Sequence, residues 1–152
     1  MNLSHIQTIT KNPFFGSEIF IHFANGYNKD TIPITLSYFI LPLILNKRTR
    51  NIFSEVNKNN TLYSLLKKHK SILSNIEERV EKHRKLTNMS LIVAHNQNDI
   101  ELSSAIKLNR NVYYSHTDVE VREFYRAAYY LGYFFGKEKR VQDIFKLFTI
   151  IE

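Results

Sequence analysis

Three glutamates in one short charged stretch are the first residues that could do chemistry. Glu77, Glu78 and Glu81 lie close together, and carboxylates at helical spacing can bind a divalent cation or exchange protons. Cations are interleaved with them, namely Arg79, Lys82, Arg84 and Lys85. Because opposite charges three or four residues apart on a helix form exposed ion pairs, the pattern favours a solvated salt-bridge face over a metal site.

The other candidates for catalysis give no better site. The six histidines include no H-x-x-x-H or H-x-x-E-H spacing, and the chain has no cysteine. Its four glycines form none of the motifs that bind phosphate or present a nucleophilic serine. We therefore predict no catalytic residue, no metal site, no cofactor and no small-molecule substrate, and we expect that the protein is not an enzyme.

The formal net charge of the chain is +7, and the excess of cations over acids is concentrated in its first half. Glu55 is the only acid in residues 47–70, a segment rich in lysine and arginine. The predicted contact residues for nucleic acid or an acidic partner are Lys47, Arg48, Arg50, Lys67, Lys68 and Lys70. Such a face can attract polyanions, and it is also compatible with a positive surface that only keeps the protein soluble.

Aromatic side chains crowd residues 113–135. A helical stripe from Val121 to Leu131 already supplies an inward face there, so rings on other faces exceed what the helix needs. Because aromatic residues are favoured anchors of protein interfaces, part of this surplus is expected to contact another subunit. The predicted partner-binding residues on this segment are Tyr129, Tyr133 and Phe134.

An apolar run from Ile34 to Leu45 could suggest a membrane span, but about 12 residues cannot cross a bilayer that needs about 20. The run is therefore interpreted as a buried helix, kinked or restarted at Pro42, that forms core and partner contacts. Its predicted partner-binding residues are Phe39, Leu41 and Leu43. The start of the chain, MNLSHIQTITKNPFF, has no secretory signal, and we expect a cytoplasmic protein that does not bind membranes.

Helices must position these groups. They are predicted over about 13–25, from the apolar run towards Phe53, after Thr61, from about Ser71, over 117–136 and from about Lys139. Asn12 caps the first helix and Gly26 ends it, whereas Thr117 and Glu120 form a capping box before the aromatic helix. The segment TNMSLIVA either closes the fourth helix or forms another.

The best strand candidate is Asp99 to Leu108, where apolar residues alternate around SSA as in a β-hairpin. No linker or repeat divides the chain. We predict a single domain over residues 1–152 of the mainly α (α+β) class. It is expected to be a compact helical domain with a small β-hairpin, winged-helix-like, with the hairpin as the wing.

Two stretches of this sequence resemble a known family, the middle component of three-component ABC systems. NPFFGSEIFIHFANGY followed by IPITLSYFILPLILNKRTR has the family's Asn-Pro, Gly-Tyr, Leu-Pro-Leu-x-Leu and Thr-Arg in order. Near the other end, AAYYLGYFFGKEKRVQDIFKLF resembles the closing helices of that family. One departure is NQNDIELSSA, which stands where the family has a glycine-marked hairpin.

The resemblance implies a non-catalytic adaptor in bacterial defence complexes against phages and plasmids. These include Lamassu-type systems, in which an SMC-like ABC ATPase works with a separate effector, often a nuclease. The adaptor would be kleisin-like in role, bridging ATPase heads and effector, and would meet DNA through the complex. The alternative from the residues alone is a stand-alone winged-helix DNA-binding protein that uses residues 47–70.

Overall fold

The protein is described by a computed structural model that covers residues 10–151. Its elements are α2 (Pro13–Tyr27), β1 (Ile32–Pro33), α3 (Ile34–Ser37), α4 (Ile40–Ile44), α5 (Lys47–Ser54), α6 (Leu62–Lys68), η1 (Lys70–Leu73), α7 (Ile76–Asn96), β2 (Ile100–Leu102), β3 (Ala105–Leu108), η2 (Tyr114–His116), α8 (Val119–Gly136) and α9 (Val141–Ile151). The predicted mainly helical fold with a small hairpin is confirmed. No helix in residues 10–151 is long and apolar enough to cross a bilayer. The predicted absence of a secretory signal falls largely on residues outside this range.

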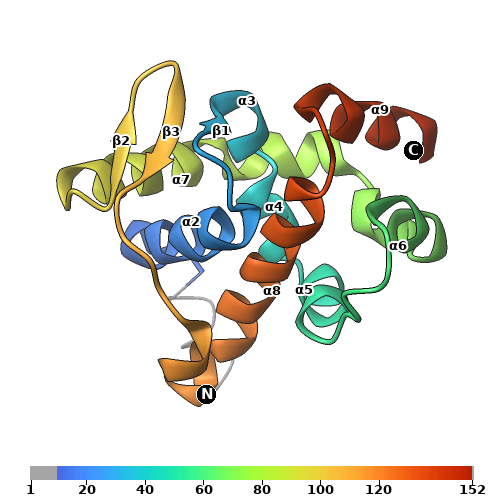
Figure 1. The fold of residues 1–152 in the computed structure, drawn as a ribbon, viewed down its shortest axis with the longest axis horizontal. Helices are drawn as coiled ribbons and strands as arrows, with labels where there is room; N and C mark the ends of the chain where they lie inside the picture. Colours follow the sequence, from blue (N-terminus) through green and yellow to red (C-terminus); the bar gives the residue numbers. More distant parts are fainter. Residues whose placement is uncertain (1–9, 152) are drawn as a thin grey trace.

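Helices α2 and α8 form the centre of the molecule (Figure 1). α8 packs against α2 and α5, and α7 packs against α2 and α4. The β2–β3 hairpin lies at one end of the long axis, and α6 and α9 lie at the other (Figure 1). Fully buried residues such as Ile19, Phe23, Leu36 and Leu131 join all these elements into one core.

Glycines let α2 and α8 approach each other. An added Cβ at Gly26 would lie 1.9 Å from the main-chain oxygen of Tyr129, and one at Gly132 would lie 2.1 Å from that of Phe23. The prediction that Gly26 ends the first helix is wrong, because α2 continues to Tyr27 and Asn28 supplies the left-handed residue at φ 52°. Gly26 is a contact residue between helices, a role that the sequence does not distinguish from a cap.

The predicted second helix is divided into three short helices, α3, α4 and α5. Pro42 lies in the first turn of α4, where its missing N–H is not needed. Asn46 then starts α5 by accepting a hydrogen bond from the Thr49 N–H at 3.1 Å. The chain therefore turns after α3 and again after α4, and the leucine, isoleucine and phenylalanine side chains of the apolar run lie in the core or pack against it.

Further along, the structure resolves or corrects the predicted helix boundaries. α7 begins at Ile76, after the 3-10 turn η1, and it includes the whole TNMSLIVA segment. The predicted capping box before α8 is wrong, because Asp118 is the N-cap residue. Thr117 instead donates its hydroxyl to the Tyr114 carbonyl at 2.6 Å, which stabilises η2.

The small sheet has three strands in the order β1-β3-β2, all antiparallel. The sequence predicted β2 and β3 but not β1, whose two residues pair with Ile106 and Ala105. This topology is compatible with the predicted winged-helix-like arrangement.

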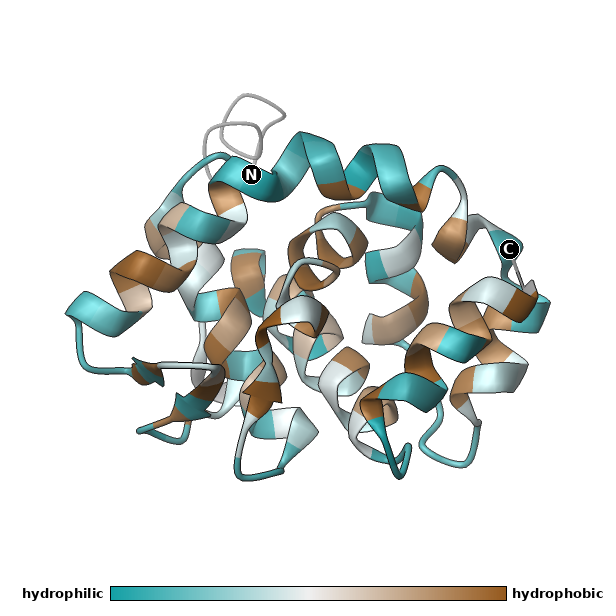
Figure 2. Cartoon of the chain, turned by 90° about the horizontal axis from the view of Figure 1, so that it is seen from above, coloured by the Kyte–Doolittle hydropathy of each residue, from teal (hydrophilic) through white to brown (hydrophobic). Residues whose placement is uncertain are grey.

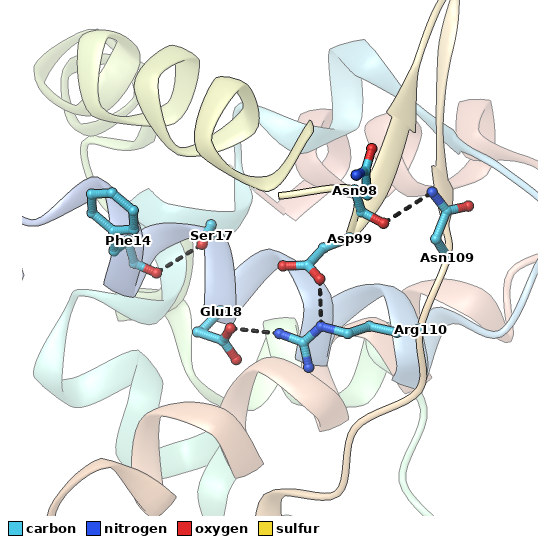
Figure 3. Close-up of polar contacts among 7 residues, drawn as sticks. All are labelled: Phe14, Ser17, Glu18, Asn98, Asp99, Asn109 and Arg110. Atoms are coloured by element: carbon cyan, nitrogen blue, oxygen red, sulfur yellow. Dashed lines mark hydrogen bonds and ion pairs between the residues drawn. The ribbon is translucent and has the colours of Figure 1, made fainter. Parts of the chain in front are cut away.

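An arginine fastens the base of the hairpin to α2. Arg110 contacts Asp99 before β2 and Glu18 on α2, each at 2.6 Å, and Asn109 donates to the Asn98 carbonyl beside them (Figure 3). Because Asp99 is almost fully buried, this pairing fixes where the hairpin leaves the domain.

A buried histidine makes the fold sensitive to acid. His22 on α2 is 1% exposed, its ring stacks on Tyr125 with centroids 4.3 Å apart, and its Nδ1 has no hydrogen-bond partner among the described residues. Burial, with a smaller contribution from the charge of Arg110, lowers the pKa of His22 to about 4. His22 is therefore neutral at pH 7.

We expect acid to destabilise the protein through His22. Its pKa is lower in the folded state than in the unfolded state, so its contribution is complete above pH 6.5 and is lost as pH falls towards 4. The free energy of unfolding should fall by about 2 kcal/mol between pH 7 and pH 4.5 from this group alone. Urea unfolding of the wild type and His22→Phe at both pH values measures it. An equal pH dependence in the two proteins would contradict the assignment.

Candidate partner-binding face

The residues predicted to bind a partner fall into two groups in the structure. Leu41, Leu43 and Phe134 are at most 1% exposed and lie in the core, so they offer no surface to a partner. Phe39 is half-buried and packs against Phe145 and Phe148 of α9. The prediction must be corrected for the three core residues: the bends between α3, α4 and α5 turn the leucines inward, and α5 covers Phe134.

Tyr129 and Tyr133 do reach the surface. They lie one turn apart on α8 and are both half-buried. Tyr129 packs against Tyr114 and Tyr130, with ring centroids 5.5 and 5.2 Å apart. Tyr133 packs against Tyr130 at 6.2 Å. These ring contacts hold the two tyrosines in fixed positions, and preorganised aromatic side chains are well suited to anchoring a partner.

Lysines from three separate loops surround these rings. The Nζ of Lys58 lies 5.6 Å from the centre of the Tyr133 ring, and that of Lys137 lies 5.4 Å from it. Lys137 also donates to the Asn60 carbonyl at 3.2 Å, and Lys29 donates to the Glu138 carbonyl at 2.6 Å. The lysines therefore rest on aromatic rings and main-chain oxygens, with no carboxylate neutralising them among the described residues.

A surface pocket of about 570 Å³ lies between these groups, and its lining includes Lys29, Tyr113, Tyr129, Tyr133 and Lys137. Tyr113 is 69% exposed. We call these five residues with Lys58 the tyrosine–lysine face. Arg126 fixes the Tyr114 ring that packs against Tyr129, because it donates to the Tyr114 hydroxyl at 3.0 Å and to the Ser54 carbonyl. The face combines apolar ring area with positive charge, so it suits a partner surface that is both apolar and acidic.

Of this face, the sequence predicted Tyr129 and Tyr133 as partner-binding residues, but not Tyr113 or the three lysines. Lys29, Lys58 and Lys137 are far apart in the chain, and only the fold brings their loops to one end of α8. Lys58 was predicted only as part of the basic segment 47–70. The signal that was present is that each lysine lies in a short polar stretch next to a predicted helix.

The predicted basic segment is divided by the fold. Arg50 is only 7% exposed, because its guanidinium lies 3.9 Å from the centre of the Phe124 ring and its Nη1 donates to the Ile44 carbonyl at 3.2 Å. It also pairs with Glu123 at 3.6 Å. The prediction that Arg50 is a surface contact residue is therefore wrong: it links α5 to α8.

The other predicted cations are exposed, and they are of two kinds. Lys67 and Lys68 lie in the last turn of α6, where positive charge is favourable, and Lys70 follows in η1. Lys47 and Arg48 lie in the first turn of α5, where the helix dipole disfavours cations. Lys47 and Arg48 therefore lower the stability of α5, and residues that lower the stability of their own helix are often found at functional surfaces.

We expect Lys47→Glu with Arg48→Glu to separate stability from binding. Acidic residues in the first turn of α5 should raise the free energy of unfolding by about 0.5 kcal/mol. The same change should weaken contact with DNA or with an acidic subunit. Thermal unfolding and partner pull-down measure the two effects, with Lys107→Glu and Lys139→Glu, two exposed lysines outside the predicted contact residues, as the charge-matched control. If the α5 variant assembles and functions at the wild-type level, these cations only solvate the surface.

No group of three or more histidine, aspartate or glutamate residues in the described range could hold a metal ion. Of the α7 glutamates considered above for metal binding, Glu81 pairs with Arg84 at 2.5 Å. Hydrogen bonding to that guanidinium lowers the pKa of Glu81, which is fully exposed. This pairing agrees with the predicted salt-bridge face.

Comparison with known proteins gives one family. The model of the family described as ABC-three component (ABC-3C) system Middle Component 3 matches residues 1–151. No curated protein and no solved structure matches the chain. Since the match spans nearly the whole sequence, the chain belongs to the ABC-three component system Middle Component 3 family.

Proposed function

We propose that this protein is the non-catalytic adaptor of a bacterial defence complex against phages and plasmids, bridging an SMC-like ABC ATPase and an effector. Membership of its family makes it an accessory component of a three-component ABC system and implies partner subunits. The match over residues 1–151 is the observation that carries the proposal. The complex is of the Lamassu type, the bridging role is kleisin-like, and DNA is met through the complex.

The tyrosine–lysine face supports a binding role. Tyr129 and Tyr133 present ring area that this chain leaves half uncovered, and three lysines beside them carry charge that no described carboxylate neutralises. Interface anchors are enriched in aromatic residues held by their neighbours, with polar groups at the rim. The ATPase is the expected partner at this face.

A stand-alone winged-helix DNA-binding protein is the alternative, since the sheet order is compatible with that fold. In such a protein α7, the helix before the hairpin, would enter the major groove. The first half of α7 exposes Glu77, Glu78 and Glu81 beside Lys82, Arg84 and Lys85, so it carries mixed charge and offers no concentrated positive surface for phosphate. Hydrophilic residues predominate along this half of α7 (Figure 2). The geometry thus favours the adaptor.

Co-expression with the proteins encoded beside it tests the proposal. We expect a stable complex with an ABC ATPase, and loss of protection against phage or plasmid when this chain is deleted. The purified chain alone should hydrolyse neither nucleotide nor nucleic acid, and it should not bind duplex DNA with the steep salt dependence of a stand-alone DNA-binding protein. Metal-dependent cleavage by the isolated chain, retained through purification of matched variants, would refute the adaptor role.

A further inference from the structure

A second surface, on the side of α7, has an apolar floor and a basic rim. A groove of about 720 Å³ runs between α7 and the junction of α4 and α5. Leu45, Leu86 and Met89 are among the residues of its floor, and Lys11, Lys82 and Lys85 lie at its rim. A neighbouring pocket of about 410 Å³ shares Lys82 and extends to Arg48. The groove is therefore continuous with the cations that begin α5.

The rim lysines are available to a partner, unlike the arginine behind them. Arg79 also lines the groove, but it donates to the carbonyls of Ile72, Ser74 and Pro42 at 2.8 to 3.0 Å and so builds the wall. Lys82 and Lys85 are exposed and enter no ion pair or hydrogen bond among the described residues. Within residues 10–151 no ion pair uses their charge.

The floor is apolar along one side of α7. Leu86 and Met89 are one turn apart, and Ile92 follows at the next turn. Met89 is 42% exposed and Ile92 is 54% exposed, so the residues that the structure describes leave this apolar surface open. Lys82 and Lys85 precede Leu86 and Met89 by four residues each, so charge and apolar area alternate along the same helix surface.

We propose that this groove binds an acidic amphipathic helix of another subunit in the same complex. A helix lying along α7 would place apolar side chains at i, i+3 and i+4 against Leu86 and Met89, and its glutamates or aspartates would meet Lys82 and Lys85. The apolar floor favours a protein over a nucleic acid backbone, which would leave Leu86 and Met89 uncovered. This inference rests on the proposed adaptor function and adds a second contact, separate from the tyrosine–lysine face.

The test places a photo-reactive phenylalanine analogue at Met89 in the co-expressed complex. The inference predicts a cross-link to a subunit segment that is net acidic and has apolar residues at helical spacing. A synthetic peptide of that segment should bind the purified chain, and Lys82→Glu with Lys85→Glu should weaken its affinity at least about tenfold. Lys107→Glu with Lys139→Glu is the matched control, because both lysines are exposed and lie outside the groove.

The outcomes separate this inference from the proposed function. A complex that forms but gives no cross-link at Met89 overturns the groove assignment and leaves the adaptor role standing. A cross-link to DNA or to a basic segment overturns it as well. If the wild-type chain forms no complex, the adaptor role fails and the groove inference fails with it. Equal thermal unfolding of both double variants excludes misfolding as the cause of weaker binding.

Discussion

Gly132→Ala is expected to unfold much of the protein, although alanine normally favours a helix over glycine by about 1 kcal/mol. The added Cβ would lie 2.1 Å from the Phe23 oxygen and 2.9 Å from the Tyr27 nitrogen. Both atoms belong to the main chain of α2, so no side chain can rotate away. The helices must separate, and the free energy of unfolding should fall by about 3 kcal/mol or more. Urea unfolding measures the loss.

Gly16→Ala is the matched control for this prediction. Its added Cβ would lie 2.0 Å from the Ser90 Oγ and 2.9 Å from the Ser90 Cβ. The hydroxyl can rotate away, so only a small shift of the Ser90 Cβ is then required. Gly16→Ala should therefore cost clearly less than Gly132→Ala. Equal unfolding free energies for the two variants would mean that the α2–α8 contact does not depend on the missing side chain.

Truncating Tyr129 and Tyr133 should break the complex and leave most of the fold intact. An exposed aromatic anchor contributes about 2 kcal/mol or more to binding, which corresponds to roughly thirtyfold in Kd. Both rings are half-buried, so Tyr129→Ala and Tyr133→Ala should lower the stability of the free chain only modestly. Binding to the ATPase and the melting temperature are measured on the same preparations.

Phe134→Ala serves as the contrast because it lies next to Tyr133 but is fully buried. It should lower the free energy of unfolding by about 3 to 5 kcal/mol. Any loss of binding should then follow the loss of folded protein. If the two tyrosine variants lose melting temperature and binding in the same proportion as Phe134→Ala, the tyrosines are core residues and the interface lies elsewhere.

The sequence predicted the helical class and the hairpin because both depend on local periodicity. It did not predict the division of residues 34–53 into three helices, since Pro42 is compatible with a kink as well as with a new first turn. β1 was missed because a strand of two residues has no periodicity to detect. Its pairing with Ile106 depends on a contact between residues separated by about half of the chain.

For the surface, the sequence separated exposed from buried residues less well. α8 is apolar on several sides and packs against both α2 and α5, so a helical stripe alone could not distinguish Phe134 from Tyr133. Arg50 was grouped with Lys47 and Arg48 by sequence proximity, although its position on α5 turns it towards Phe124. The groove beside α7 joins Leu45 to Lys85, and no sequence motif connects residues so far apart.

The most direct test of the adaptor role is the association of ATPase and effector with and without this chain. Each subunit is purified separately, and the mixtures are measured by size-exclusion chromatography with light scattering. We expect an assembly that contains ATPase and effector only when this chain is present, and we expect the Tyr129→Ala, Tyr133→Ala double variant to abolish it. ATPase and effector associating equally well in its absence would contradict the account.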